Sequence, residues 1–545
     1  MNAAELFVKC LEAEGVRYIF GLPGEENAHF LMALEDSPIE LILTRHEQGA
    51  AFMGETYGKL TGEAGVCLST LGPGATNLVT GVASANMDRS PMVVITGQAD
   101  LQRQHKESHQ YFDVMSMFKP ITKWGARIVH PDNIPEVVRR AFRVATREKP
   151  GACHIELTED VAAMAAGKKP IKRSYLRRTV ADDKIVDIAM DVLRSAEHPV
   201  ILAGNGAIRT RASKQLRIFV ELTGIGVIST FMAKGCVSRQ APESVFTIGL
   251  QTKNLANAAI EAADLVITVG YDLVEYPPRL WNKWGDKKII CVDFLPAEVD
   301  QSYQLDAEVI GDVAHTLWMM NERLRANPLR FDVPRQRKTR EMLLALFAEH
   351  KDDDTEGRIR PQKALWDVRQ ALGPRDILLS DVGSHKMWVA QYYHCDEPNT
   401  CLIPNGFCSM GGALPGAIAA KLVHPDRKVM ALCGDGGFLM NVQELETAVR
   451  LKTNIVVMVW VDNGFNLIEW KQKNEFGHHS NLSFGNPDFV QLAESFGCIG
   501  LRVENARDLA PALDKAFAAS KPVVIAVPID YRENDRLMDQ LRIVV

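Results

Sequence analysis

Several features are absent from this sequence, and each absence excludes a class of protein. The ten cysteines form no C-x-x-C pair, which argues against a zinc site or a redox dithiol of that spacing. A net charge of -6 gives no basic field for nucleic acid. No segment reads as a membrane span or a secretory signal, because even Met1 to Val16 is an amphipathic helical pattern with several charges. We therefore expect a cytoplasmic protein without nucleic-acid or membrane partners.

The chain also lacks polar low-complexity tracts. Its hydrophobic share of 46% and charged share of 24% are typical of globular proteins. Because 545 residues exceed what one hydrophobic core holds, several domains are expected. Two charged stretches, Gly167 to Arg178 and Asn327 to Arg360, read as linkers in which the Lys351 to Asp354 run is solvated. We predict three domains, over residues 1–166, 180–325 and 360–545.

Short apolar runs alternate with helical patterns along most of the chain. They are Ile39 to Thr44, Gly65 to Leu71, Met92 to Gly97, Ala152 to Leu157, Val200 to Ala203, Leu265 to Gly270, Val429 to Cys433 and Ile455 to Val461. Such alternation indicates buried parallel strands between helices. The prediction is an α/β protein with three doubly wound parallel-sheet domains. The first and third resemble each other, since each has a strand that ends in a glycine loop before a helix.

Two aspartates follow neighbouring strands of the third segment. Asp435 ends one apolar run, a helical pattern follows over 441–451, and the next run delivers Asp462, 27 positions after Asp435. In a right-handed βαβ unit both strands are parallel, so the two carboxylates emerge at the same edge of the sheet. A G-D-G tripeptide by itself is more often a tight turn with a helix cap. The second aspartate at the matching strand end favours a magnesium site instead.

Two glycines after Asp435 suit the other half of such a site. Gly436 and Gly437 let backbone N–H groups and the start of a helix approach a diphosphate closely. Magnesium commonly binds one or two carboxylates together with substrate phosphates. The sequence therefore predicts a magnesium and diphosphate site at the end of this strand.

The motifs in this region carry a resemblance to a known family. GDGGF followed by VWVDNG resembles the signature of thiamine-diphosphate-dependent enzymes, and aspartate at the second metal position is similar to the catabolic, flavin-independent acetolactate synthases. Other segments are similar in family order: FGLPGEEN (Phe20 to Asn27), LGPGATN (Leu71 to Asn77), SHQYFD (Ser108 to Asp113), DVGSHKMW (Asp381 to Trp388) and NGFCSMGGALP (Asn405 to Pro415).

This resemblance implies the cofactors and their ligands. Thiamine diphosphate and Mg²⁺ are expected, with the metal held by Asp435, Asp462 and the carbonyl of Gly464. It also implies that 1–166 is a pyrimidine-binding domain, 180–325 a central domain and 360–545 a diphosphate-binding domain. The implied cofactor-binding residues are Pro23, Gly24, Gly72, Gly383, Ser384, His385, Cys408, Met410, Gly434, Gly436 and Gly437.

Two residues of this set have specific implied roles. Met410 would wedge beneath the thiazolium, whereas without the resemblance it would be read as a gap-filling core residue. Cys408 would accept a hydrogen bond from the aminopyrimidine through its backbone carbonyl. Gly383 to His385 resembles the loop that touches the diphosphate, although a plain turn before a helix is the alternative.

Glu47 is the candidate activating carboxylate. It follows the run Ile39 to Thr44 and begins a helical pattern in RHEQGAAFM. An acidic residue in a first helical turn is by itself more often a partner of the helix dipole. The resemblance implies instead that it binds the pyrimidine nitrogen of the cofactor and promotes loss of the proton from the thiazolium carbon. In the family this glutamate serves the third domain of another subunit, so a homodimer is the expected minimum and a homotetramer the commoner outcome.

The middle segment and two further residues bear on the reaction. Gly204-Asn205-Gly206 is only a weak sign of dinucleotide binding, because the G-x-G-x-x-G motif is absent. The sequence from Tyr271 to Tyr276 is similar to that of flavin-free synthases. Gln110 resembles the residue that orients the acceptor, with a surface amide as the alternative. Lys471 departs from the glutamine typical of catabolic synthases, and either binds an acceptor carboxylate or points to solvent.

The expected reaction follows from these assignments. The resemblance implies decarboxylation of pyruvate and transfer of the two-carbon unit to a second 2-oxo acid, which gives 2-acetolactate. The alternatives are a 2-oxo-acid decarboxylase or an acyl transferase with another acceptor. The first segment lacks the adjacent His-His pair that would favour a decarboxylase. A non-catalytic cofactor-binding protein would be expected to have lost Glu47 or an aspartate ligand.

Overall fold

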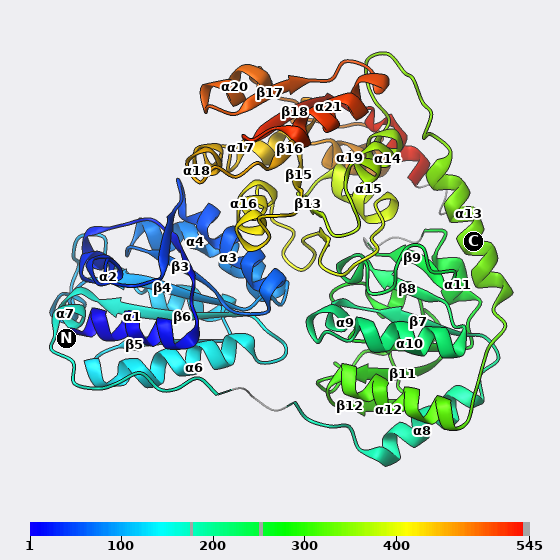
Figure 1. Cartoon of the computed structure of the whole chain (residues 1–545), viewed down its shortest axis with the longest axis horizontal. Coiled ribbons are helices and arrows are strands. Elements are labelled where there is room, and N and C mark those ends of the chain that lie inside the picture. Colours follow the sequence, from blue (N-terminus) through cyan, green and yellow to red (C-terminus); the bar gives the residue numbers. More distant parts are fainter. Residues whose placement is uncertain (175–177, 250–253, 538–545) are drawn as a thin grey trace.

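The structure is a computed structural model that describes residues 1–174, 178–249 and 254–537. It contains three six-stranded sheets in which neighbouring strands are parallel. In Figure 1 they form three lobes, blue to cyan, green, and yellow to red, in chain order. This confirms the predicted α/β class with three doubly wound parallel-sheet domains. The boundaries at 1–166, 180–325 and 360–545 stay a prediction.

The first and third sheets have the same strand order. The first runs β2-β1-β3-β4-β6-β5 and the third β14-β13-β15-β16-β18-β17, which is the same permutation of six consecutive strands. The strands of the first sheet are β1 Tyr18–Gly21, β2 Glu40–Leu43, β3 Gly65–Ser69, β4 Met92–Gln98, β5 Trp124–Ile128 and β6 Ala152–Thr158. Those of the third are β13 Ile377–Ser380, β14 Cys401–Leu402, β15 Val429–Gly434, β16 Val456–Val461, β17 Ile499–Arg502 and β18 Val523–Pro528.

The central sheet has a different order, β12-β11-β10-β7-β8-β9. Its strands are β7 Pro199–Ala203, β8 Val227–Thr230, β9 Ser244–Ile248, β10 Leu265–Val269, β11 Lys288–Asp293 and β12 Ala307–Ile310. In each sheet the order reverses between two neighbouring strands: β1 and β3, β10 and β7, or β13 and β15. Ligands of open α/β sheets bind beyond the carboxyl ends of such strands.

Helices cover the sheets of all three lobes (Figure 1). The first has α1 Ala3–Glu14, α2 Ala28–Leu34, α3 Glu47–Thr61, α4 Pro73–Met87, α5 Val114–Phe118, α6 Ile134–Thr146 and α7 Glu159–Ala163. The second has α8 Asp183–Arg194, α9 Asn205–Arg209, α10 Ser213–Thr223, α11 Asn257–Glu261, α12 Val313–Ala326 and α13 Pro334–Ala348. The third has α14 Pro361–Ala371, α15 Ser384–Tyr392, α16 Ala413–Val423, α17 Asp435–Leu439, α18 Glu444–Arg450, α19 Asn466–Phe476, α20 Phe489–Ser495 and α21 Ala506–Ala518.

The predicted linker over 327–360 is wrong in its middle, where α13 forms. Of this helix only Gln336, Thr339 and Leu343 are buried. Gln336 joins the central sheet by donating to Pro199 O at 2.8 Å and accepting from Gly226 N at 2.7 Å. Most of the helix is solvated, so its sequence is rich in charged residues. It has few of the regularly spaced apolar residues by which a helix is recognised. In the other predicted linker, residues 167–174 and 178 belong to no helix or strand, and 175–177 lie outside the described residues.

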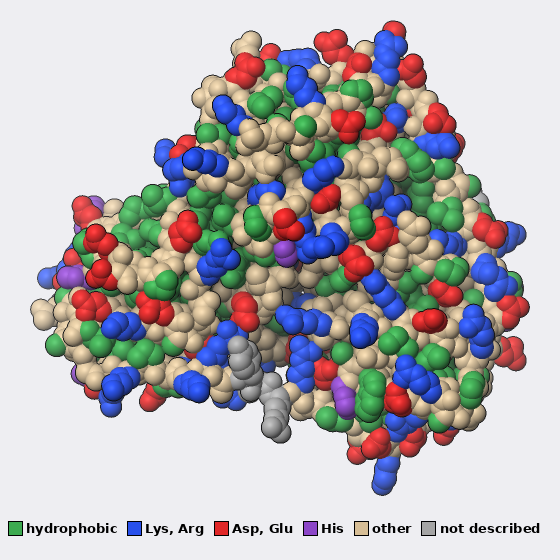
Figure 2. Space-filling model, viewed as in Figure 1, with side chains coloured by type: hydrophobic (Ala, Val, Ile, Leu, Met, Phe, Trp, Pro, Cys, Tyr) green, Lys and Arg blue, Asp and Glu red, His purple; other side chains and the backbone are tan. Residues whose placement is uncertain are grey.

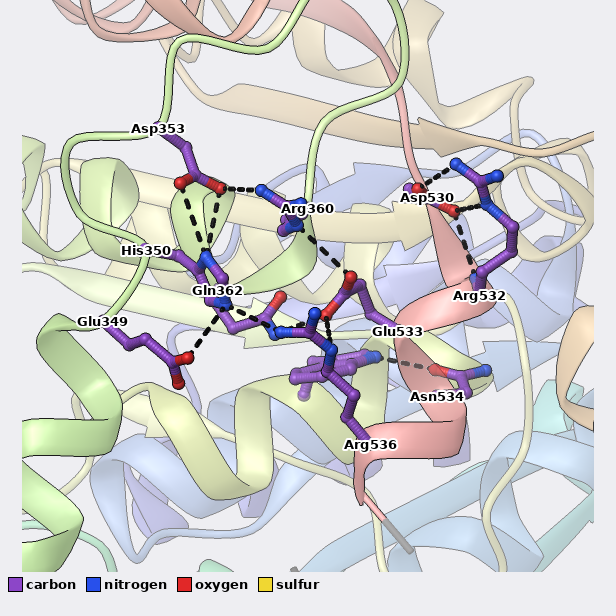
Figure 3. Close-up of polar contacts among 11 residues, drawn as sticks. Glu349, His350, Asp353, Arg360, Gln362, Asp530, Arg532, Glu533, Asn534 and Arg536 are labelled. Carbon is purple, nitrogen blue, oxygen red and sulfur yellow. Dashed lines mark hydrogen bonds and ion pairs between the residues drawn. The ribbon is translucent and has the colours of Figure 1, made fainter. Parts of the chain in front are cut away.

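The acidic run after α13 is not simply solvated either. Asp353 accepts from Arg360 at 2.6 Å, and Arg360 also reaches Glu533 at 3.2 Å (Figure 3). These bonds tie the connection into the third domain to the last described segment of the chain. The Arg360–Glu533 contact spans 173 positions and the Arg360–Asp353 contact spans seven, so only the shorter contact was accessible to sequence reasoning.

The surface agrees with the modest net charge. Acidic and basic side chains are interspersed over the face seen in Figure 2. Among helices of the described residues, none combines the length and apolar character needed to cross a membrane.

Candidate active site

Glu47 is the first residue of α3, as the sequence predicted. His46 caps this helix, since its Nδ1 accepts from Gln48 N at 3.0 Å. The Glu47 side chain is buried, and its carboxylate accepts from Asn77 Nδ2 on α4 at 3.0 Å. A hydrogen-bonded, desolvated carboxylate of this kind is fixed in position and can bind a nitrogen of a ligand.

The two glycine loops of the first domain lie at its strand-order reversal. Pro23 and Gly24 follow β1, and Gly72 follows β3. A Cβ on Gly24 would lie 2.3 Å from Thr70 Cβ, so the loops pack too closely for a side chain. Gly72 has a φ of +47°, and a Cβ on it would lie 2.7 Å from the carbonyl oxygen of Gln110. The exposed Gln110 therefore belongs to the same edge of the sheet as Glu47.

Asp435 and Asp462 emerge together from the third sheet. They follow the paired strands β15 and β16, in which Gly434 is opposite Trp460. The Asp435 carboxylate is buried and accepts from the backbone N–H of Asp462 at 3.1 Å and of Asn463 at 2.7 Å. Burial, and then the facing Asp435, raise the pKa of Asp462 to about 8. A cation beside Asp462 would offset both of these causes and stabilise its ionised form.

Gly464 completes this turn next to Asp462. Asn463 has a φ of +64°, and Gly464 pairs with Ser483 in an isolated β-bridge. This turn directly follows Asp462. The described residues contain no group of three or more His, Cys, Asp or Glu side chains arranged as a metal site. Two carboxylates and a backbone oxygen, with phosphate oxygens from a ligand, are nonetheless a suitable donor set for magnesium.

A buried histidine beside the G-D-G turn has one ring nitrogen without a partner. The Nε2 atom of His385 is buried and makes no hydrogen bond, and burial lowers its pKa to about 3. A Cβ on Gly434 would lie 3.1 Å from this ring, so His385 directly faces the G-D-G turn. Gly383 and Ser384 precede it at the start of α15, beyond β13. The free Nε2 atom of this neutral imidazole fits a polar ligand at the reversal between β13 and β15.

The glycines after Asp435 are required by packing. A Cβ on Gly436 would lie 2.8 Å from the Phe465 ring, and one on Gly437 would lie 2.8 Å from Asp381 Oδ2. The helix predicted over 441–451 is shorter than expected, because α17 occupies 435–439 and α18 begins at Glu444. Residues 441–443 form turns instead, in which Glu444 N donates to Asn441 O at 3.0 Å, and the Asn441 side chain donates to Gly411 O at 2.8 Å.

The segment with Cys408 and Met410 lies across the same region. Its end is held by Asp381, whose carboxylate accepts from Gly411 N at 2.9 and 3.0 Å. Burial raises the pKa of Asp381 to about 7, against the effect of these backbone donors. Cys408 has a φ of +55° and its Sγ lies 3.0 Å from Lys386 Nζ. Neither Cys408 nor Met410 is buried, so Met410 is not a core residue.

Several polar residues of the site were not identified from the sequence. Asp381 and Asn441 fix the Met410 segment, and Asn534 joins two helix starts by donating to Ser384 Oγ at 3.1 Å and Asn466 Oδ1 at 2.9 Å. Asn534 also accepts from the Trp388 indole at 2.8 Å, near the polar cluster in Figure 3. Each contact joins residues far apart in the chain, and polarity within an apolar motif was the only available signal. Lys471 lies exposed on α19, a helix without buried residues.

Within one chain the candidate residues form two groups. One group contains Glu47 and Gln110 at the first sheet, and the other contains Asp435, Asp462 and His385 at the third. The described side chains of these two groups make no hydrogen bond or ion pair with each other. The two domains nevertheless touch, because Glu444 accepts from the backbone N–H of Arg45 at 3.0 Å and of His46 at 3.1 Å.

A separate cavity of about 720 Å³ lies elsewhere, between the ends of α3, α6 and α9. It is lined by arginines such as Arg143, Arg147 and Arg209 and contains none of the predicted site residues. The predicted site residues lie instead at the strand-order reversals of the first and third sheets.

Comparison with known proteins identifies the class to which this fold and site belong. Three family profiles match successive parts of the chain: the N-terminal TPP binding domain of thiamine pyrophosphate enzymes at residues 1–117, their central domain at 186–320 and their C-terminal TPP binding domain at 381–527. The chain belongs to the thiamine pyrophosphate enzymes. Thiamine pyrophosphate is another name for thiamine diphosphate.

Similar proteins narrow the class further. The chain is 37% identical to an acetolactate synthase of Bacillus subtilis, over 98% of this chain and 94% of that protein. It is 36% identical to a catabolic acetolactate synthase of Raoultella terrigena, over 99% of this chain and 97% of that protein. A probable acetolactate synthase large subunit of Methanocaldococcus jannaschii is 35% identical over 98% of this chain and 93% of its own length.

Proposed function

We propose that this protein is a thiamine-diphosphate and magnesium dependent acetolactate synthase that works without flavin. It decarboxylates pyruvate and transfers the two-carbon unit to a second 2-oxo acid, which gives 2-acetolactate. The observation that carries the proposal is the pair of neighbouring aspartates, Asp435 and Asp462, beside the free Nε2 atom of His385, in a chain similar to acetolactate synthases over nearly its whole length.

Magnesium would be held by Asp435, Asp462 and the carbonyl of Gly464. The raised pKa of Asp462, about 8, reflects burial and the neighbouring Asp435 charge, and a divalent cation would relieve both costs. The diphosphate would accept hydrogen bonds from His385 and from backbone groups at Gly434, Gly436 and Gly437. These residues converge at the reversal of the third sheet.

The bound cofactor supplies a nucleophilic carbon and an electron sink for decarboxylation. In this chain Glu47 would hold a proton at the pyrimidine ring, and its bond to Asn77 keeps the carboxylate aimed. Met410 would support the thiazolium from below, and the Cys408 carbonyl would accept from the aminopyrimidine. Gln110, near Gly72, would orient the acceptor 2-oxo acid.

Flavin independence is supported by the central sheet. At its reversal the carboxylate of Glu275 accepts from Asn205 N with both oxygens at 3.0 Å. Asn205 begins α9 directly after β7, where a dinucleotide phosphate binds in related sheets. Glu275 is buried, and burial raises its pKa to about 7. A carboxyl group in this position competes with a phosphate for the same backbone donor.

We also infer a homo-oligomer, with a dimer as the minimum and a tetramer as the commoner outcome. The lack of a hydrogen bond or ion pair between the described side chains of the two groups supports this inference. Glu47 of one chain would then complete the Asp435 site of another, and the first, central and third domains would be the pyrimidine-binding, central and diphosphate-binding domains. We propose the cytoplasm as its location, because buried thiols such as Cys67 and Cys433 suit a reducing compartment.

Product analysis tests this function. Purified protein supplied with pyruvate, Mg²⁺ and thiamine diphosphate should be colourless and should release carbon dioxide and 2-acetolactate in equal amounts. Acetaldehyde as the main product would identify a 2-oxo-acid decarboxylase instead. A product formed only with another acceptor would identify an acyl transferase, and cofactor binding without turnover would identify a non-catalytic protein. Flavin absorbance in stoichiometric amount would overturn the flavin-free assignment.

A further inference from the structure

The segment from Pro404 to Gly411 is held at both ends by buried carboxylates from different domains. Asp381 of the third domain holds the Gly411 end. At the other end, Asp88 of the first domain accepts from Gly406 N at 2.6 Å and from Asn405 N at 3.2 and 3.3 Å. Between these anchors lie the two residues that the proposed function puts against the cofactor.

Asp88 is well placed to hold this segment. It follows the last residue of α4, and its side chain is fully shielded from solvent. An ionised carboxylate binds backbone N–H groups roughly twice as strongly as a neutral acceptor does. Because these donors and this acceptor are more than 300 positions apart, the bonds are a tertiary connection between domains rather than part of a local turn.

Lys59 compensates the buried charge of Asp88. Its Nζ lies 2.9 Å from Asp88 Oδ2 and 2.6 Å from Glu55 Oε1. Burial opposes the positive charge of Lys59, but the two carboxylates overcome it and raise the pKa of the ammonium. The ion pair offsets the cost of burying the Asp88 carboxylate, whose oxygens also accept from the backbone.

Close packing makes the contact geometrically strict. A Cβ on Gly406 would lie 2.8 Å from the carbonyl oxygen of Met87, so the segment rests directly on the end of α4. The next residue, Arg89, pairs with Asp272 of the central domain at 3.1 Å. Adjacent residues at the end of one helix thus contact both other domains.

We propose that Asp88 is a positioning residue that sets the height of the Met410 segment beneath the thiazolium. It acts across the domain boundary within one chain, whereas the proposed function takes the catalytic glutamate for that site from another chain. The inference rests on the proposed role of Met410. Loss of the Asp88 bonds would let the segment move from α4, and a displacement of about 1 Å near reacting groups can reduce a rate by up to about a hundredfold.

The test compares Asp88→Asn with Gly406→Ala in the full-length protein containing Mg²⁺ and thiamine diphosphate. The first variant removes the charge that holds the segment, and the second pushes the segment from Met87 without changing Asp88. In both, hydrogen exchange at the amides of residues 405 and 406 should quicken by about ten- to hundredfold, as expected for loss of a charge-assisted bond. Exchange of the thiazolium proton should slow by about tenfold or more, while cofactor affinity changes little because the metal residues are intact.

Asp312→Asn is the matched control. Asp312 is also buried, caps α12 and pairs with Arg178 at 2.6 Å, but it lies in the central domain away from this segment. It should leave both exchange rates at wild-type values even if the melting temperature falls. Protection of residues 405 and 406 in Asp88→Asn that equals wild type would overturn the proposal. So would freed amides together with unchanged thiazolium exchange.

The outcome also separates this inference from the proposed function. If wild-type protein binds the cofactor but makes no acetolactate, the amide and thiazolium exchange measurements still decide the role of Asp88. If wild-type protein makes acetolactate and neither variant changes thiazolium exchange, only the role of Asp88 is wrong.

Discussion

The first and third sheets share one strand order but carry different chemistry at the same place. The reversal of the third sheet, between β13 and β15, holds two neighbouring aspartates and a buried imidazole whose Nε2 atom has no partner. The corresponding reversal of the first sheet, between β1 and β3, holds only close-packed glycine loops, with Glu47 nearby on α3. Topology therefore determines where a ligand can bind, and the loop residues determine which part of a ligand it is.

The central sheet extends this comparison. Its reversal lies between β10 and β7, and there Glu275 occupies the backbone donor of Asn205. The strand-order reversal thus holds two neighbouring carboxylates in the third sheet, close-packed glycines in the first sheet and a buried carboxyl group in the central sheet. Substitutions at the three positions should consequently affect different properties.

The largest effect is expected at the third sheet. Asp435→Ala or Asp462→Ala should abolish magnesium-dependent retention of thiamine diphosphate, a loss greater than the roughly 10- to 100-fold that removal of a supporting residue costs. Calorimetric titration of the cofactor with and without Mg²⁺ measures it. Asp488→Ala is a control in the same domain, since Asp488 caps α20 and should leave affinity unchanged. Undiminished affinity in either site variant would refute the metal role.

The first sheet should give a purely kinetic effect. Glu47→Gln keeps a side chain that can bond to Asn77 but removes the charge that activates the pyrimidine, so turnover should fall by about a hundredfold to ten thousandfold. Cofactor affinity should stay near wild type, in contrast to Asp435→Ala. Steady-state acetolactate formation and titration of the cofactor on the same preparation distinguish the two effects. Acetolactate formation at the wild-type rate would contradict the assignment.

The central sheet should affect stability rather than catalysis. The folded-state pKa of Glu275, about 7, lies above the value of roughly 4.3 for an exposed glutamate. The stability contributed by the protonated form is therefore present below roughly pH 4.3 and is lost as pH rises through 7, a change of about 4 kcal/mol. Glu275→Gln should flatten the fall in melting temperature between pH 5 and pH 8. A fall as steep as in wild type would show that Glu275 does not titrate in this range.

Sequence reasoning was most successful where local patterns decide the structure. The apolar runs identified β15 and β16 correctly, and the parallel order of a βαβ unit correctly brought Asp435 and Asp462 to one edge. It was wrong about α13, because a helix with three buried residues has little periodic signal. The roles proposed for Glu47, Gln110 and Met410 came from resemblance and stay predictions until variants are measured.

Long-range polar contacts could not be predicted in this way. Asp88 and Asp381 hold the two ends of one segment. Glu444 accepts from the backbone N–H groups of the two residues before Glu47, almost 400 positions away in the chain. Nothing in the spacing of these residues links them, since the contacts exist only after the domains pack together. A buried acidic residue in an otherwise apolar or glycine-rich context is the signal that would have identified them as candidates.

The smallest effect is expected at Lys471, where the chain departs from the glutamine of catabolic synthases. If its ammonium binds the acceptor carboxylate, Lys471→Gln should raise the acceptor concentration needed for carboligation while leaving decarboxylation of the first substrate nearly intact. A charge-assisted hydrogen bond in a partly dry site is worth about 1.5 to 3 kcal/mol, or roughly ten- to hundredfold. Because Lys471 is exposed, solvent screening favours the lower end of that range.

Lys471→Met should reduce acceptor capture more than Lys471→Gln, because glutamine keeps a hydrogen-bond donor. Lys473→Gln is the matched control, since Lys473 lies on the same helix and pairs with Glu469. Decarboxylation and carboligation measured separately over a range of acceptor concentrations distinguish the cases, and equal acceptor dependence in all four proteins would assign Lys471 to solvent.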